Sequence, residues 1–175
     1  MCMTICMKKK TDLLLNLEQD NQSLCWLQAD LLLKKQFLLA TAESCTGGMI
    51  AATCTDLAGS SQWFDRGFVT YSNAAKTDML GVDAALIAQF GAVSEPVARA
   101  MAEGAIKHSA AQVSVAVTGV AGPSGGSAEK PVGTVWLAWC IKGHTSAELC
   151  HFDGDRATVR ALTVRQALEG LIKRL

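Results

Sequence analysis

The chain has 175 residues, of which half are apolar and 18% are charged, and its 16 basic side chains balance 16 acidic ones. This composition suffices for one domain with a sizeable core and excludes a disordered chain. Without a basic excess, a general nucleic-acid-binding surface is not expected, whereas a local cationic pocket for one small anion is compatible with it. No apolar run approaches the ~18 residues of a transmembrane helix, and no signal-peptide pattern is present, so we expect a cytoplasmic protein without membrane contact.

The seven cysteines are scattered along the chain. They form no Cys-x-x-Cys pair, and none lies near a histidine at the spacing of a zinc finger. We therefore expect reduced thiols and no metal site.

The first part of the chain precedes the expected core. We expect a variable leader over residues 1–20, mobile in its first ten residues, and one domain over residues 21–175. Leucines at helical spacing predict an amphipathic helix over residues 13–35, with a break near Asp20 and Asn21. A short apolar run at residues 37–41 has the length of a strand.

The remaining segments alternate between strand and helix patterns. Ser72, Asp83 and Ser94 are placed to cap three successive helices. The run Val113–Val117 is almost wholly apolar, which is typical of a strand buried on both faces. The other expected elements are helices over residues 49–53, 72–80, 83–90, 94–108 and 157–175, and strands over residues 68–71, 132–141 and 147–152. This order predicts an α/β fold, a three-layer α/β/α sandwich with a central mixed β-sheet.

Small polar residues follow three of the expected strands. The segments are Glu-Ser-Cys-Thr-Gly-Gly at 43–48, Tyr-Ser-Asn-Ala-Ala-Lys at 71–76, and Thr-Gly-Val-Ala-Gly-Pro-Ser-Gly-Gly at 118–126. Ligands of open α/β sheets bind in the crevice beyond the strand ends. We therefore expect the three loops to converge on one pocket.

The first loop contains a candidate nucleophile. A serine at a strand-to-helix turn presents its hydroxyl outward, and the helix-start amides offer contacts to an anion or oxyanion. Ser44 has this place, and Gly47 and Gly48 allow close approach to the backbone. On local sequence alone, Ser44 or Thr46 serving only as a helix cap is an equal alternative. Cys45 is a rival nucleophile, although no nearby histidine would lower its thiol pKa.

The second loop supplies candidates for a base. None of the three histidines lies in these loops, so the base would be a lysine with a depressed pKa or a tyrosine. Tyr71 is the only tyrosine, and Lys76 follows it at a strand-to-helix transition. Alone, Lys76 would be taken for a solvated helix lysine. Burial and a nearby cation, with Arg156 a candidate, would lower its pKa by disfavouring the ammonium form.

The third loop resembles a phosphate-binding loop, but it lacks the Gly-Lys-Ser/Thr ending of a Walker A motif. Arg156, just ahead of the last expected helix, is placed to bind a phosphate through its guanidinium fork. The alternative is a capping aspartate at Asp155 beside a surface arginine.

Five segments together make the sequence resemble the CinA C-terminal-domain family: 41–48, 67–73, 91–96, 118–123 and 130–135. The similarity runs in order from residue 24 to residue 175, and only about the first twenty residues depart from it. The characterised activity of the family is nicotinamide mononucleotide deamidase. The resemblance implies a three-layer α/β/α fold, a homodimer or higher homo-oligomer, and no metal or organic cofactor. It also implies a mononucleotide substrate whose carboxamide is hydrolysed to nicotinate mononucleotide and ammonia.

The resemblance also implies roles for particular residues. The serine that the family is proposed to use as nucleophile falls on Ser44, its tyrosine on Tyr71 and its lysine on Lys76. Further substrate-pocket positions fall on Thr118 and Arg156. Together with the loop residues, the candidate substrate-binding residues are Thr46, Gly47, Gly48, Asn73, Thr118, Gly119 and Arg156.

The expected mechanism follows from both lines of reasoning. Ser44, deprotonated by Lys76 with Tyr71 relaying or orienting the proton, attacks the amide carbonyl. Helix-start amides near Thr46 and Gly47 hold the oxyanion, ammonia leaves, and water hydrolyses the acyl-enzyme.

Two other classes of function are compatible with parts of the sequence. A catalytically silent regulator that binds a nucleotide or phosphate would use the glycine loops and Arg156, but it would need neither Tyr71 nor Lys76. A thiol-based redox or acyl-transfer protein would use Cys45, which lacks a partner histidine. The presence of Ser44, Tyr71 and Lys76 together favours the hydrolase.

Overall fold

Five strands form one mixed sheet in the spatial order β2–β1–β3–β4–β5. The computed structural model describes residues 2–175, with side chains from residue 11 onward. The strands are β1 (Leu39–Glu43), β2 (Phe64–Val69), β3 (Val113–Gly119), β4 (Thr134–Ile141) and β5 (His144–His151). β1 pairs in parallel with both β2 and β3, whereas β4 pairs antiparallel with β3 and β5. The predicted mixed sheet is confirmed.

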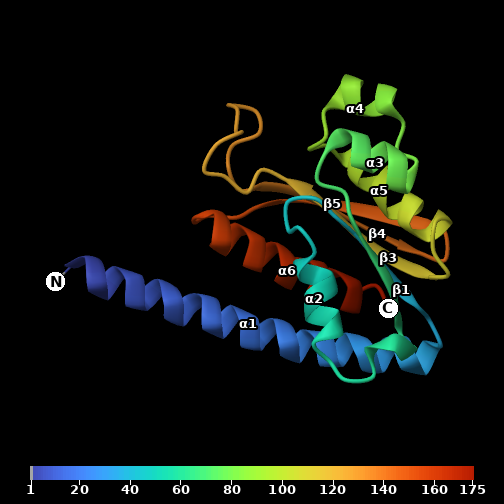
Figure 1. Ribbon diagram of the computed structural model, residues 1–175, viewed down its shortest axis with the longest axis horizontal. Coiled ribbons are helices and arrows are strands. Elements are labelled where there is room, and N and C mark those ends of the chain that lie inside the picture. Colours follow the sequence, from blue (N-terminus) through green and yellow to red (C-terminus); the bar gives the residue numbers. More distant parts are fainter. Residues whose placement is uncertain (1) are drawn as a thin grey trace.

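Helices cover both faces of this sheet (Figure 1). The helices are α1 (Cys2–Lys35), α2 (Met49–Thr55), α3 (Asn73–Leu80), α4 (Ala84–Phe90), α5 (Glu95–Lys107) and α6 (Arg156–Ile172). One apolar core joins α1, α2 and α6 to the sheet, and a second core lies beneath α3, α4 and α5. The predicted three-layer α/β/α sandwich is therefore confirmed.

The first helix corrects one expectation. α1 is continuous from Cys2 to Lys35, so the predicted break near Asp20 does not occur. The polar residues there serve the packing on α6: Asn21 Nδ2 donates to the carbonyl of Ala161 (3.4 Å), and Asp20 pairs with Arg165 (3.2 Å). The segment expected to be a variable leader, residues 1–20, is helical from Cys2 onward, and the division into a leader and a domain stays a prediction. Met1 and the side chains of residues 2–10 lie outside the described part.

The end of β1 and the start of β2 also differ from expectation. β1 extends to Glu43, two residues beyond the predicted run, and β2 begins at Phe64, four residues earlier than expected. Pairing between the two strands is the reason, because β2 aligns with β1 from Leu39 opposite Phe64 to Glu43 opposite Val69. Residues without a strand pattern of their own are thereby included in the sheet. The prediction that β3 is buried is confirmed.

Helix caps and one close contact place α3. Ser72 and Asp83 cap α3 and α4 by accepting from the amides of Ala75 (3.0 Å) and Ala85 (2.8 Å), as predicted. Ser94 precedes α5, but its hydroxyl donates to a loop carbonyl instead of accepting from a helix amide. α3 packs closely on α5 because Gly104 has no side chain, and a Cβ there would collide with the main chain of Leu80.

None of the helices in the described part is long and apolar enough to cross a membrane.

Candidate active site

The three polar loops meet at one cavity of about 210 Å³ beyond the carboxyl ends of β1 and β3. The switch point of the sheet lies between β1 and β3, because the chain leaves β1 toward β2 on one side and later returns to β3 on the other. The cavity is lined by Ser44, Cys45, Tyr71, Asn73, Lys76, Ala92, Val93, Thr118, Gly119, Ala121 and Arg156. Among the residues predicted from sequence, the nucleophile, both base candidates and four of the substrate-binding candidates line this cavity.

Ser44 and Lys76 are in direct contact. Lys76 Nζ lies 3.1 Å from Ser44 Oγ and donates to the carbonyl of Thr70 at 2.9 Å. The contact joins residues 32 positions apart, since Ser44 follows β1 and Lys76 lies in the first turns of α3. Lys76 is only 1% exposed and Ser44 8% exposed. The lysine is therefore not a solvated helix residue.

Burial lowers the pKa of Lys76, because removal from water disfavours the ammonium form, and the neighbouring Cys45 acts in the opposite direction. The lowering and its cause, burial, were both expected, but the nearby cation that was expected to contribute is not among the causes. Arg156, the cation expected to contribute, instead donates Nη1 to the carbonyl of Gly122 (2.9 Å) and Nη2 to Tyr71 Oη (3.1 Å).

Tyr71 lies at the mouth of the cavity and is 63% exposed. Within the described part, its hydroxyl is hydrogen-bonded to Arg156 and makes no direct bond to Ser44 or Lys76. The structure therefore places Tyr71 beside Arg156 at the entrance, whereas the relay role expected from the sequence would require the hydroxyl to reach Ser44.

Cys45 lines the same cavity but is poorly suited to be the nucleophile. Burial raises the pKa of its thiol to about 11, with the nearby Glu43 adding to the effect. The thiolate is the reactive form, so at neutral pH this cysteine is almost entirely in the unreactive thiol form. Ser44 remains the nucleophile candidate with a potential base in contact.

The turn after Ser44 differs from the expected anion site. Thr46, Gly47 and Gly48 do not line the cavity. Gly47 N donates to the carbonyl of Ser44 (3.1 Å), and the Thr46 hydroxyl donates to the Glu43 carboxylate (2.7 Å). The amides of Gly47 and Gly48 are thus bonded within the protein, and the expectation that amides near Thr46 and Gly47 hold the oxyanion stays a prediction.

Glu43 is the residue that sequence reasoning missed. Its side chain is fully buried, and besides Thr46 it accepts from the amides of Gly48 (3.0 Å), Ile50 (3.0 Å) and Ala51 (2.8 Å). These amides belong to the start of α2, which would otherwise leave them unpaired. The available sequence signal was an acidic residue at the junction between the expected strand and the expected helix.

The end of β3 forms the opposite wall. Thr118 is 1% exposed and donates its hydroxyl to the carbonyl of Ala92 (2.8 Å), which ties β3 to the loop before α5. Gly119 allows β3 to lie against β4 there, since a Cβ would come within 2.7 Å of Val135 Cγ2. Asn73 completes the rim from the start of α3.

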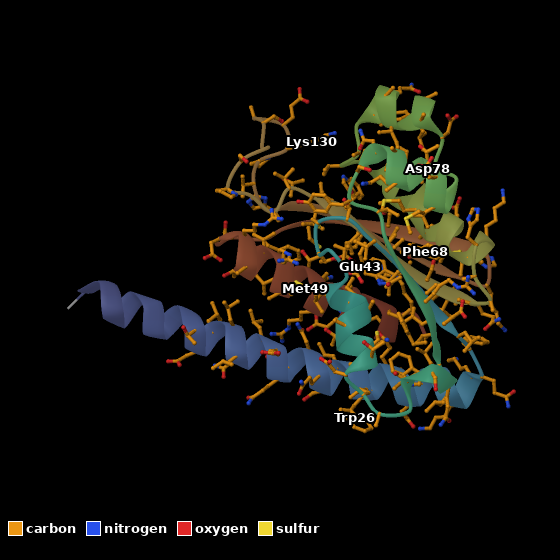
Figure 2. The ribbon with its side chains drawn as sticks, viewed as in Figure 1. Trp26, Glu43, Met49, Phe68, Asp78 and Lys130 are labelled. Atoms are coloured by element: carbon orange, nitrogen blue, oxygen red, sulfur yellow. The ribbon has the colours of Figure 1, made fainter. Side chains whose placement is uncertain are left out.

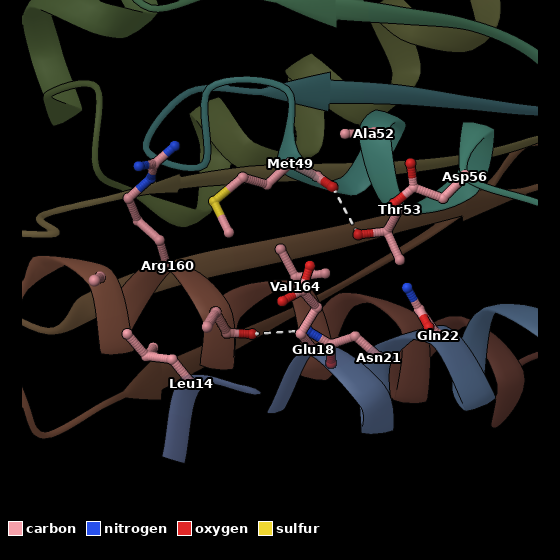
Figure 3. A pocket seen from close by; sticks show the side chains of 12 residues that line it. Leu14, Glu18, Asn21, Gln22, Met49, Ala52, Thr53, Asp56, Arg160 and Val164 are labelled. Carbon is pink, nitrogen blue, oxygen red and sulfur yellow. Dashed lines mark hydrogen bonds between the residues drawn. The ribbon is translucent and has the colours of Figure 1, made fainter. Parts of the chain in front are cut away.

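A larger cavity of about 350 Å³ lies on the other side of the sheet, between α1, α2 and α6 (Figure 3). It contains none of the predicted catalytic or substrate-binding residues. Among the side chains that the structure describes, no group of three His, Cys, Asp or Glu is placed to hold a metal ion. The three histidines are exposed and do not line the Ser44 cavity.

The fold and the site define a three-layer α/β/α protein with a buried serine–lysine contact at the switch point of its sheet. The chain belongs to the CinA C-terminal domain family, whose model matches residues 21–175.

Two relatives and one solved structure illustrate the similarity. The chain is 54% identical over 134 residues to a CinA-like protein of Akkermansia muciniphila, a match covering 76% of this chain and 32%, about a third, of that protein. It is 56% identical over 135 residues to the nicotinamide-nucleotide amidohydrolase PncC of Pseudomonas putida, covering 77% and 84%. The crystal structure of competence damage-inducible protein A from Klebsiella pneumoniae superimposes with a TM-score of 0.86 at 40% identity, covering 88% of this chain and 96% of that one.

Proposed function

We propose that this protein is an amidohydrolase that converts nicotinamide mononucleotide to nicotinate mononucleotide and ammonia. The relative from Pseudomonas putida carries the name of such an enzyme, and the similarity covers most of both chains. The observation that carries the proposal is the contact of 3.1 Å between Ser44 Oγ and Lys76 Nζ. A serine becomes an effective nucleophile when a base lies within hydrogen-bond reach, and a lysine becomes a base when burial lowers its pKa.

The chemistry then proceeds in two stages. Neutral Lys76 takes the proton of Ser44, and Oγ attacks the carboxamide carbon to form a tetrahedral intermediate. When this collapses, the C–N bond breaks, and Lys76 returns the proton to the departing nitrogen, which leaves as ammonia. Water, deprotonated by Lys76, then cleaves the ester, which releases the carboxylic acid and restores Ser44.

The oxyanion would be held by donors in the cavity wall, since the amides that begin α2 bond to Glu43. Asn73, Thr118 and Gly119 line that wall and are the proposed substrate-binding residues around the carboxamide. The Asn73 side chain is the proposed donor, because the hydroxyl of Thr118 already donates to the carbonyl of Ala92. The preorganised position of such donors, in a site shielded from water, is what makes them effective.

The phosphate end would bind near Arg156. The cavity of about 210 Å³ is smaller than the roughly 300–1,000 Å³ of typical ligand pockets, so the nucleotide would enter only with its carboxamide end. Arg156 lines both this cavity and an adjoining open hollow of about 600 Å³. In the described part, four of the six arginines pair with carboxylates, and Arg156 and Arg160 form no such pair. A guanidinium with free donors is suited to bind phosphate.

The proposal is tested by measuring ammonia release from nicotinamide mononucleotide by the purified protein in the presence of EDTA. We expect activity that survives the chelator and falls at least a hundredfold in Ser44→Ala, whereas Ser23→Ala, an exposed position on α1, serves as a control and stays active. Retention of more than a tenth of the activity in Ser44→Ala would contradict the assignment. Binding of the nucleotide without turnover would indicate the silent regulator instead.

A further inference from the structure

We propose that Glu43 and Arg160 are positioning residues that hold the turn from Ser44 to Gly48 on two sides and thereby set Ser44 Oγ against Lys76 Nζ. This inference rests on the proposed function, because it assigns these residues to the same serine–lysine site. Neither residue lines the Ser44 cavity. Their effect would therefore be transmitted through the main chain of the turn.

The side chains of Glu43 and Ser44 point to opposite faces of the sheet because they are neighbours along the chain at the end of β1. Successive side chains of a strand point to opposite faces of the sheet. In β1, Leu39 packs into the core beneath α1, α2 and α6, while Ala40 and Ala42 pack into the core beneath α3 and α5. By the same alternation Glu43 points toward α2, and Ser44, the next residue, points toward Lys76 on α3.

The Glu43 carboxylate is a dedicated anchor for this turn. Figure 2 labels Glu43 and Met49, which mark the two ends of the connection between β1 and α2. Oε2 accepts from the Thr46 hydroxyl and from the amides of Gly48 and Ile50, and Oε1 accepts from Ala51. These four bonds use about all the acceptor positions of a carboxylate.

No ion pair of the described residues involves Glu43, although its side chain is fully buried. A buried charge is costly unless hydrogen bonds replace its hydration, and here the turn and the first amides of α2 supply all of those bonds. The position of the carboxylate and the shape of the turn therefore depend on each other.

Arg160 holds the same turn from α6. Its Nη2 donates to the carbonyl of Thr46 at 2.7 Å. Figure 3 shows the Arg160 side chain extending from α6 toward the segment that leads to Met49. Thr46, itself fully buried, is thus fixed by Glu43 through its hydroxyl and by Arg160 through its carbonyl. A residue only two positions from the nucleophile is held by two opposite charges.

If Glu43 and Arg160 only position Ser44, replacing them should affect the chemical step and not the binding of the substrate. A displacement of about 1 Å in a catalytic group can cost on the order of 10²-fold in rate. Loosening the turn should therefore lower kcat while leaving KM nearly unchanged. Arg160 also borders the open hollow beside Arg156, where it could contact the substrate. The KM of an Arg160 variant distinguishes the two roles, because loss of a substrate contact would raise KM and loss of a positioning contact would not.

The test compares Glu43→Gln, Arg160→Met and Arg160→Lys with the wild type. Arg165→Gln is the matched control, because this arginine lies on the same helix but pairs with Asp20 and Glu169 at the surface. For each protein we would measure kcat and KM for nicotinamide mononucleotide, the melting temperature, and the rate at which a fluorophosphonate labels Ser44. We expect kcat to fall about a hundredfold in Glu43→Gln and about tenfold or more in Arg160→Met, with KM within a factor of about three.

The labelling rate should fall in parallel, and Arg160→Lys should recover part of the lost rate because it keeps a donor for the Thr46 carbonyl. A folded Glu43→Gln protein with wild-type kcat, or a rise in KM at constant kcat in either variant, would overturn the inference. If Glu43→Gln does not fold, the Arg160 variants decide. If the wild type lacks amidase activity, the proposed function fails, and the labelling rates still show whether these residues position Ser44.

Discussion

Replacing Lys76 by methionine separates the base from the rest of the site. Methionine keeps the length of the apolar stem in a position that is 1% exposed, and removes the amine that contacts Ser44 and the Thr70 carbonyl. A positioned proton transfer is worth about 10²–10⁴-fold, which corresponds to roughly 2.7–5.5 kcal/mol on the barrier. We expect a loss of kcat in that range. The unpaired Thr70 carbonyl costs about 1–3 kcal/mol of folding free energy, which relief from burying the ammonium partly offsets, so the variant should fold.

The lowered pKa of Lys76 predicts how activity and stability change with pH. Because burial lowers the pKa of Lys76, the neutral amine is present at lower pH than for an ordinary lysine. Ammonia release should rise with pH and level off below the ordinary value of ~10.4, with an apparent pKa that belongs to the coupled site. Between the native and unfolded pKa values the native state binds fewer protons, so the free energy of unfolding also rises with pH through this window. Lys76→Met should lack both dependences.

The assay is ammonia release across the pH range in wild type, Lys76→Met and Lys76→Arg, with urea unfolding at two pH values. Lys76→Arg keeps the positive charge but cannot act as a base, so it should be nearly as inactive as the methionine variant. Near-normal turnover in Lys76→Arg would refute the reasoning. Lys76 would then be an electrostatic or structural residue, and Tyr71 would become the leading candidate for the base.

Three further substitutions test other parts of the structure. Cys45→Ala should remain active, because the raised pKa of about 11 keeps this thiol protonated. If the variant lost both ammonia release and labelling of Ser44, this prediction would be contradicted. Arg156→Ala should weaken binding of the mononucleotide by about 1.5–3 kcal/mol and leave the riboside unaffected, as KM values for both would show; equal losses would assign Arg156 to folding or chemistry. Gly104→Ala should destabilise the protein by about 1–3 kcal/mol, seen as a lower melting temperature, because the new methyl group collides with the main chain at Leu80; an unchanged melting temperature would contradict the close packing.

Local patterns were sufficient to predict most of the elements. Ser72 and Asp83 cap helices because a short polar side chain just before a helix accepts a hydrogen bond from a backbone amide two or three residues later. The apolar run of β3 predicted its burial, since only a strand covered on both faces consists almost wholly of apolar residues. Properties of this kind depend on neighbours in the sequence and can be predicted from the sequence.

Predictions failed where partners come from distant segments. The polar pair at Asp20 and Asn21 suggested a break in α1, but these side chains bond to α6, about 140 residues away, and the helix continues. Glu43 similarly extends β1, because β2 and β3 pair with it on both sides. No local pattern contains these partners.

The candidate site divides in the same way. Taken alone, the sequence determined that small polar residues follow three strand ends, and it offered Ser44 and Cys45 as candidate nucleophiles and Tyr71 and Lys76 as candidate bases. Only the tertiary structure decided that Lys76 is buried against Ser44, that Tyr71 lies with Arg156 at the entrance, and that the first amides of α2 are occupied by a carboxylate. Burial and hydrogen-bond partnership are set by which segments meet in space, and these two properties determine whether a lysine is a solvated cation or a base.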